Sequence, residues 1–263
     1  MKATRAPVIG ARDQAAGLRN LFKDGASTRT LSLLVSDCAH MAPTLALGLA
    51  RTLITQGRRV LVIDETPLDA SRPQPTPLYR VQYDLGQGLT GTTPLAGCIK
   101  SIQPNLYFAS AARIAKHLKQ YSGQLHLPNE LRSVGLEIDY LLIIGGPDHA
   151  HHSSVYGGDQ LIWLLCAASH AASDFALDGL LNQCAPYQGR TKNSALPTLM
   201  VGNDQIGPGK SSKQAPFDAL KKRFAQYSKL RPDYLGWISA TAEADETPIP
   251  VSLLQDLSRR LLV

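Results

Sequence analysis

The stretch RTLSLLVSDCAHMAPTLALGLARTLITQGRRVLVIDET, residues 29–66, decides the fold of this chain. Leu31–Val35 and Val60–Ile63 are short apolar runs, typical of strands in a parallel sheet that is buried on both faces. Between them, leucine and isoleucine recur at helical spacing, and Gln56-Gly57 is a typical helix end. The stretch therefore predicts strand, tight loop, amphipathic helix and strand, which is how a nucleotide-binding α/β domain begins.

The rest of the chain continues this alternation. Apolar runs predict further strands at 106–109, 139–144, 161–166, 198–201 and 234–238, and helices are predicted at 94–102, 111–120, 131–137, 174–181, 217–227 and 252–262. Two stretches read as turn-rich or irregular, residues 85–91 and 145–158. We therefore predict an α/β fold with one doubly wound, mostly parallel sheet flanked by helices over residues 30–263, and an N-terminal arm over residues 1–29.

Composition limits the classes of protein that this chain can be. Its 44% hydrophobic content is ordinary for a packed domain and argues against disorder. A net charge of +6 favours an acidic partner or surface without requiring nucleic acid. The 4 cysteines show no CxxC pairing, so reduced thiols in the cytoplasm are expected. We find no signal-peptide core and no apolar run of membrane-spanning length, so we expect a soluble, cytoplasmic protein.

The loop between the first strand and its helix lacks the groups that hold a phosphate. It reads SDCAHMAPT, residues 36–44, with no glycine and no lysine. Pro43 has no backbone N–H and no charge, so it removes a donor and a cation together. The frame of a phosphate-binding fold is thus present, whereas its cradle is absent.

Taken together, several segments resemble the FlhG/FleN (YlxH) flagellar-number regulators, which belong to the MinD/ParA group of P-loop ATPases. The resemblance covers nearly the whole chain. It is carried by DQAAGLR near the N-terminus, GRRVLVID, IDYLLII, SDFALDGL and DYLGWI. It implies a MinD-like fold and a partner, the signal-recognition-type GTPase FlhF.

In that family the loop has the form KGGxGKT. Its threonine falls on Thr44, which places Pro43 at the phosphate-binding lysine and Cys38 at the lysine that acts across the dimer. Its glycines fall on Ala39, His40 and Ala42, where a Cβ obstructs close approach of the backbone to phosphates.

The carboxylates of the family site are also replaced. Of the DxD-like pair after the second strand, Asp64 remains and Thr66 stands at the second position, while the Walker B aspartate falls on Ile144. Losing three or more charge-assisted contacts at roughly 1.5–3 kcal/mol each weakens nucleotide binding by at least about three decades. We therefore expect a pseudo-ATPase with no cofactor and no catalytic residue.

The N-terminal segment, by contrast, carries the complete family motif DQAxxLR in Asp13, Gln14, Ala15, Leu18 and Arg19. In the family this motif docks on the FlhF GTPase and stimulates its GTP hydrolysis. The resemblance implies that Gln14 positions a water in the partner, Asp13 caps the helix, Leu18 anchors it and Arg19 meets an acidic group.

Other readings of polar clusters remain open. Asp148, His149, His151 and His152 are expected in a solvated loop, with a metal site as the alternative, and the absence of G-x-S-x-G disfavours a serine hydrolase. A solvated basic loop is the preferred interpretation of IGPGKSS, residues 206–212. The basic region 210–231 predicts a solvated face, with non-specific contact to nucleic acid or anionic lipid as the alternative and no specific nucleic-acid site. The helix at 252–262 either packs on the domain or gives weak membrane contact.

Three functions follow as hypotheses. The first is a non-catalytic FlhG-like regulator of flagellar number or placement that acts on an FlhF-like GTPase, with flagellar switch (C-ring) components or a flagellar transcription activator as further partners, at a cell pole or the inner membrane. The second is a divergent but active MinD/ParA-type ATPase. The third is a sister placement factor beside cellulose-synthesis or pilus machinery.

Overall fold

The computed structural model describes part of the chain. The described residues are 28–35, 41–66, 81–119, 121, 124–145, 149, 153–157, 161–168, 195–202 and 231–239, together with single positions between 217 and 259. The side chains of β6 and β7 are outside this set. Asp13–Arg19 and the loop 36–40 also lie outside the described residues, as does the predicted helix at 174–181.

An eight-stranded sheet forms the centre of the fold, in the order β3-β4-β2-β5-β1-β6-β7-β8. The strands are β1 (Arg29–Val35), β2 (Val60–Asp64), β3 (Lys100–Gln103), β4 (Leu106–Ser110), β5 (Tyr140–Ile144), β6 (Leu161–Ala168), β7 (Ala195–Gly202) and β8 (Arg231–Ser239). Every neighbouring pair is parallel except β3 with β4. The predicted doubly wound, mostly parallel fold is confirmed.

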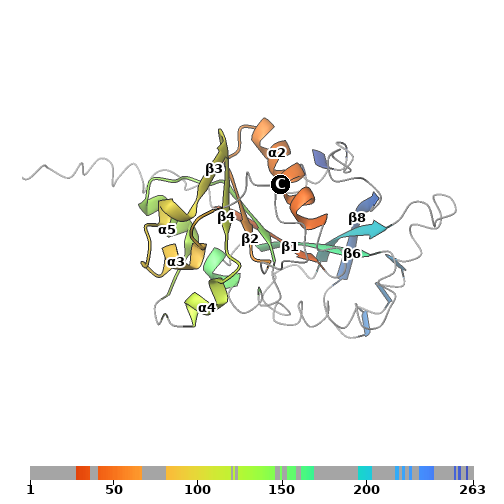
Figure 1. Cartoon of the computed structure of the whole chain (residues 1–263). Coiled ribbons are helices and arrows are strands. Elements are labelled where there is room, and N and C mark those ends of the chain that lie inside the picture. Colours follow the sequence, from red (N-terminus) through yellow and green to blue (C-terminus); the bar gives the residue numbers. More distant parts are fainter. Residues whose placement is uncertain are drawn as a thin grey trace, which may run out of the picture.

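Helices cover both faces of the β4-β2-β5-β1 part of the sheet (Figure 1). On one face, α2 (Met41–Thr55) packs its leucines against β1, β2, β4 and β5. On the other face lie α3 (Leu85–Leu89), α4 (Ile114–Leu118) and α5 (Leu127–Ser133), with the short 3-10 turns η2 (Leu95–Cys98) and η3 (Ser153–Tyr156). Two apolar cores therefore sandwich the central strands, as expected for strands whose residues are buried on both faces.

The α2-side core also receives Leu254, which is 5% exposed. This residue belongs to the predicted C-terminal helix, of which residues 252, 254–255 and 259 are described and helical. Packing on the domain is thus confirmed for Leu254. Among the described residues, no helix has the length and apolarity needed to cross a bilayer.

Three local predictions are wrong. Residues 85–91 were expected to be turn-rich, but α3 forms because Asp84 accepts the N–H of Gly86 and Gln87 accepts the N–H of Asp84, a capping box. The predicted helix at 94–102 is instead η2 followed by the edge strand β3. The predicted helix at 131–137 ends early, since Gly135 has φ +77° and terminates α5.

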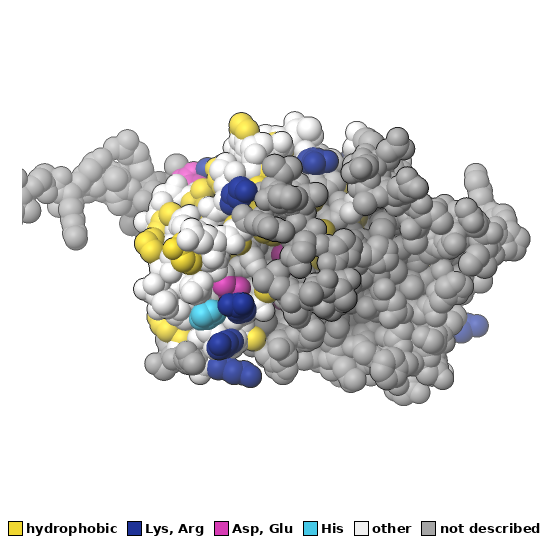
Figure 2. All heavy atoms as spheres, in the orientation of Figure 1, with side chains coloured by type: hydrophobic (Ala, Val, Ile, Leu, Met, Phe, Trp, Pro, Cys, Tyr) yellow, Lys and Arg dark blue, Asp and Glu magenta, His cyan; other side chains and the backbone are white. Residues whose placement is uncertain are grey.

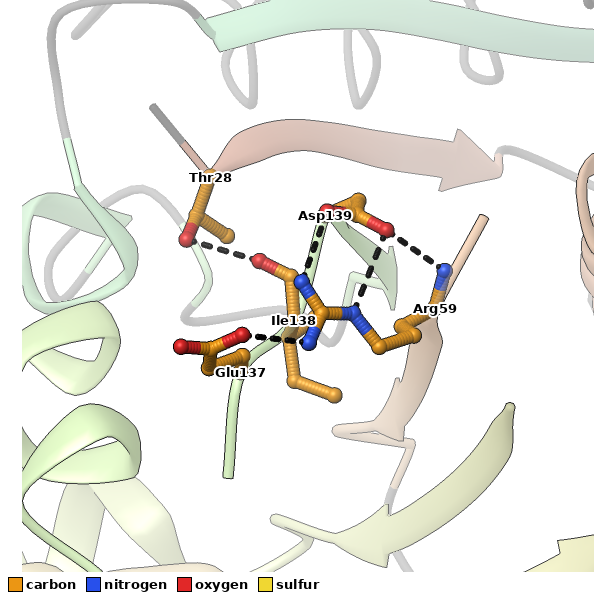
Figure 3. A network of polar contacts seen from close by, with 5 residues as sticks. All are labelled: Thr28, Arg59, Glu137, Ile138 and Asp139. Carbon is orange, nitrogen blue, oxygen red and sulfur yellow. Dashed lines mark hydrogen bonds and ion pairs between the residues drawn. The ribbon is translucent and has the colours of Figure 1, made fainter. Parts of the chain in front are cut away.

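The amino ends of the central strands are held by an ionic cluster (Figure 3). Arg59, just before β2, contacts Glu137 at 2.6 Å and Asp139 at 3.3 Å, and the hydrogen bond with Glu137 is the main cause that raises the pKa of the Arg59 guanidinium. Asp139 also accepts the backbone N–H of Arg59 at 2.8 Å. Thr28, where the arm joins β1, donates to the carbonyl of Ile138 at 3.0 Å. The N-terminal arm is therefore attached at the amino edge of the sheet.

This geometry predicts unequal costs for two neighbouring carboxylates. Glu137 is half exposed, and its ion pair with Arg59 joins two partly solvated side chains, so Glu137→Ala should cost no more than about 1 kcal/mol of unfolding free energy. Asp139→Ala also removes the acceptor of a backbone N–H and should cost about 1–3 kcal/mol. Urea unfolding of both variants measures the difference. Equal losses would show that the backbone contact contributes nothing.

Candidate functional site

The carboxyl ends of β1, β2 and β5 form the edge where parallel α/β folds bind ligands. At this edge α2 starts at Met41, so Ala42, Pro43 and Thr44 lie in its first turn, while Cys38, Ala39 and His40 lie outside the described residues. Proline fits there because first-turn N–H groups have no intrahelical partner. Those N–H groups are, however, the ones that bind an anion at a helix start. The first turn of α2 is thus helical, but at Pro43 it lacks one backbone N–H that could bind a phosphate.

Beside this turn, the last residues of β2 and β5 pair in register, Asp64 with Ile144. Ile144 is 1% exposed and belongs to the same apolar core as Ala42 and Leu45. The position predicted to have lost its aspartate therefore carries a methyl-rich side chain packed beneath α2. The Ile144 side chain therefore offers no polar atom that could bind water or a hydrated metal ion.

The remaining carboxylate, Asp64, makes local contacts. Its Oδ1 accepts hydrogen bonds from the backbone N–H of Thr66 at 2.9 Å and from the Thr66 hydroxyl at 2.6 Å. This is the turn that aspartate commonly stabilises two residues ahead of itself. The structure thus brings Ala42, Asp64 and Ile144 to one edge, and two of the three are apolar.

On the opposite face of the same edge lies a buried polar cluster. His149 places Nδ1 2.7 Å from Glu65 Oε2 and Nε2 2.9 Å from Ser32 Oγ. The Tyr156 hydroxyl donates to Glu65 Oε1, and the rings of Tyr156 and His149 stack with centroids 5.8 Å apart. Thr30 Oγ1 donates to the Tyr156 carbonyl at 2.8 Å. Each of these five residues is at most 4% exposed.

The expectation of a solvated polar loop is therefore wrong for His149 and for η3. His149 is 1% exposed because it sits over the sheet beside Gly145, where an added Cβ would come within 3.3 Å of the imidazole. Residues 153–156 form a 3-10 turn whose Val155 and Tyr156 enter the second core. Asp148, His151 and His152 lie outside the described residues.

Sequence reasoning missed the partners of His149, which are Ser32, Glu65 and Tyr156. One signal was available, because Thr30 and Ser32 alternate with leucines in β1 and so predict a polar stripe on one face of a buried strand. A buried hydroxyl in a central strand requires a hydrogen-bond partner. The sequence could not predict which residue is that partner, since His149 is 117 residues from Ser32.

The cluster predicts a loss of stability at alkaline pH. Burial, followed by the nearby charge of Glu65 and then the hydrogen bond to it, raises the pKa of Tyr156 well above the ordinary value of 10.0, with a smaller effect from Asp84. Because the tyrosine of the unfolded chain ionises near pH 10 and the buried one does not, Tyr156 contributes fully to the free energy of unfolding only below about pH 10. As pH rises from there toward the folded-state pKa, this contribution falls by up to about 1.4 kcal/mol per pH unit.

Urea unfolding at pH values from about 8 to about 11 checks this prediction. Tyr156→Phe removes the titrating group and should flatten the alkaline limb relative to the unchanged chain. Tyr121→Phe is the matched control because Tyr121 is 42% exposed, and it should retain the steep limb. Parallel alkaline limbs in wild type and Tyr156→Phe would contradict the assignment.

Basic side chains gather over α4, near the carboxyl end of β4 (Figure 2). Arg113, Lys116 and Lys119 are exposed at spacing of three residues, which places neighbouring cations on one side of the helix. In the basic region predicted at 210–231, Lys221 and Lys222 are described and exposed. These cations favour encounter with an acidic partner.

Comparison with solved structures identifies the architecture. A Cyanothece McdA variant in complex with ATP superposes with a TM-score of 0.60 at 18% identity, covering 89% of this chain and 96% of that one. This chain has the fold of the MinD/ParA-type P-loop ATPases. A chain of the Aquifex aeolicus MinC:MinD cell division protein complex gives a TM-score of 0.56 at 13% identity, with 89% of this chain and 96% of that one covered.

A second kind of enzyme shares the MinD/ParA-type fold. Cobyrinic acid a,c-diamide synthase from Mycobacterium smegmatis, with bound ADP and magnesium, gives a TM-score of 0.59 at 15% identity over 89% of this chain and 94% of that one. No protein-family model and no curated protein matches the chain. At these identities the likeness establishes the fold, and function has to be argued from this chain's own residues.

Proposed function

We propose that this chain is a non-catalytic MinD/ParA-like protein, a pseudo-ATPase of the FlhG type. The observation that supports the proposal most is Ile144, buried in the apolar core at the carboxyl end of β5, where a Mg²⁺-dependent site requires a carboxylate. Pro43 in the first turn of α2 adds the loss of a donor and a cation at the same edge.

The regulatory activity is assigned to the N-terminal arm. Its motif residues, Asp13 to Arg19, are complete in sequence, and we propose that they dock on an FlhF-like GTPase and stimulate GTP hydrolysis. Thr28, which directly follows the motif-bearing part of the chain, lies at the amino edge of the sheet, opposite the edge that carries Pro43 and Ile144. Stimulation of the partner should therefore be independent of any nucleotide added for this chain.

GTP turnover by an FlhF-like GTPase, with and without the full chain, tests the regulatory activity. We expect stimulation that is equal in the presence and absence of a non-hydrolysable ATP analogue. Absence of stimulation would remove the FlhG assignment and favour a sister placement factor of cellulose-synthesis or pilus machinery. Flagellar switch components or a flagellar transcription activator would then lose their support as further partners.

A divergent ATPase is the competing function. The solved relatives in complex with ATP or with ADP and magnesium favour it, since they share the architecture. It requires a metal site without an aspartate at position 144 and a phosphate cradle without glycine, and the charge-assisted contacts of complete sites are each worth about 1.5–3 kcal/mol. The buried apolar edge therefore favours the non-catalytic alternative.

A further inference from the structure

The cluster of Ser32, Glu65, His149 and Tyr156 joins four segments that are distant in sequence. Ser32 lies in the middle of β1, Glu65 directly follows β2, His149 follows β5, and Tyr156 ends η3. Glu65 continues the β2 ladder, because its N–H donates to the carbonyl of Ile144 at 3.0 Å. The cluster therefore connects the chain after β5 to both strands that neighbour β5.

The hydrogen bonds of the cluster are mutually consistent. Glu65 accepts from the Tyr156 hydroxyl and lies within hydrogen-bond distance of His149 Nδ1, while Ser32 Oγ lies within hydrogen-bond distance of His149 Nε2, so each polar side chain of the cluster has a partner. With side chains of Glu65 and His149 each 1% exposed, these bonds form away from water. Buried networks whose members are all satisfied hold one arrangement strongly, because opening them strands polar groups.

The order Ser–His–Glu is also that of a hydrolase relay, and burial excludes that use here. Ser32 is 0% exposed, and its strand is paired with β5 on one side and β6 on the other. A substrate carbonyl would have to reach Ser32 Oγ through the packed second core. The relay geometry is therefore structural.

The segment 145–157 is attached at three described points. The Gly145 N–H donates to the Leu33 carbonyl at 3.0 Å, His149 enters the cluster, and η3 is held by both Tyr156 and the Thr30 hydroxyl. Gly145 favours this close packing, since a Cβ there would lie 3.1 Å from Leu34 Cδ2 and 3.3 Å from the His149 ring, which is tighter than an ordinary contact. In nucleotide switches, loops at such an edge are ordered by the γ-phosphate and Mg²⁺ and released on hydrolysis.

We propose that the Ser32–His149–Glu65–Tyr156 cluster is a clamp that fixes Gly145, His149 and residues 153–157 on the sheet in place of a nucleotide. The clamp rests on the proposed pseudo-ATPase function, because its side-chain hydrogen bonds order residues that a bound nucleotide would otherwise order. It gives these described residues one conformation at all nucleotide concentrations. A partner of this edge therefore meets a constant surface.

Hydrogen–deuterium exchange of peptides within 145–157, measured on the full chain with and without millimolar Mg·ATP, tests the clamp. We expect identical protection in the two conditions. Tyr156→Phe keeps the ring and removes one hydrogen bond to a charged group, so it should speed exchange of the segment at least about tenfold, while a peptide from α2 stays unchanged. Ser154→Ala, in the same turn and exposed, is the matched control and should have no effect.

Glu65→Gln is the second variant, since it keeps the size of the side chain and removes the charge. Unchanged exchange in both Tyr156→Phe and Glu65→Gln, or a change of the wild-type segment on adding Mg·ATP, would overturn the clamp. Calorimetry on the same wild-type sample separates the two proposals. If ATP binds and exchange of the segment does not change, the pseudo-ATPase proposal is refuted and the clamp is retained. If ATP does not bind and exchange in Tyr156→Phe and Glu65→Gln equals that of wild type, only the clamp is refuted.

Discussion

Ile144→Asp is expected to lower the free energy of unfolding by about 4 kcal/mol or more and to leave nucleotide affinity unchanged. Under the proposed function, the substitution places a carboxylate where the resembling P-loop ATPases carry one. In this chain, however, the side chain points into an apolar core shared with Ala42 and Leu45, and it is 1% exposed. A carboxyl group there is either charged without a partner or protonated at a cost, and both alternatives destabilise the folded state.

Two controls separate charge from shape at position 144. Ile144→Val removes one methyl group and should cost only about 1 kcal/mol. Ile144→Asn has nearly the size of Asp without its charge, and should fall between the two. Urea unfolding gives the three values, and Mg²⁺-dependent stabilisation is measured in parallel. An Ile144→Asp chain that is as stable as wild type, or that is stabilised by Mg²⁺, would show that the edge has kept a working polar site.

Gln14→Ala should return GTP hydrolysis by an FlhF-like partner to its unstimulated rate. The reason is that Gln14, as the resemblance implies, orients the attacking water in the partner's active site, and alanine has no polar group that could orient it. Single-turnover GTP hydrolysis with saturating full chain measures the effect. Asn20→Ala, just outside the motif, is the matched control and should stimulate like wild type.

A binding measurement distinguishes the roles within the motif. Gln14→Ala should still bind the partner, whereas Leu18→Ala should bind more weakly because it loses the apolar anchor. Full stimulation by Gln14→Ala would refute the mechanism even if the complex forms. Loss of binding by both variants would assign Gln14 to docking instead.

The frame of the fold could be predicted from sequence because it depends on long periodic segments. The apolar runs of β1, β2 and β5 and the leucine spacing of α2 are strong signals, and all four elements are present. Short elements were harder, since α3 has 5 residues and depends on the capping box of Asp84 and Gln87 more than on periodicity. The edge strand β3 has 4 residues and little apolar content, so it read as part of a helix.

The two faces of the carboxyl edge differed in how well they could be predicted. The apolar character of the face beside α2 could be predicted at Ile144, because that residue ends an apolar run and could be compared with a motif position. The polar cluster on the other face could not, since Glu65 and His149 are 84 residues apart and neither belongs to a recognised spacing. Non-local pairs of this kind follow from the sheet order, in which β5 lies between β1 and β2.

Calorimetric titration of the full chain with Mg·ATP tests the central claim, the absence of a nucleotide site at this edge, most directly. With Pro43 in the first turn of α2 and Ile144 at the end of β5, we predict no heat beyond dilution at micromolar ligand, because affinity should be at least about three decades weaker than in a complete site. A micromolar Kd that depends on Mg²⁺ would contradict the pseudo-ATPase and establish a divergent ATPase.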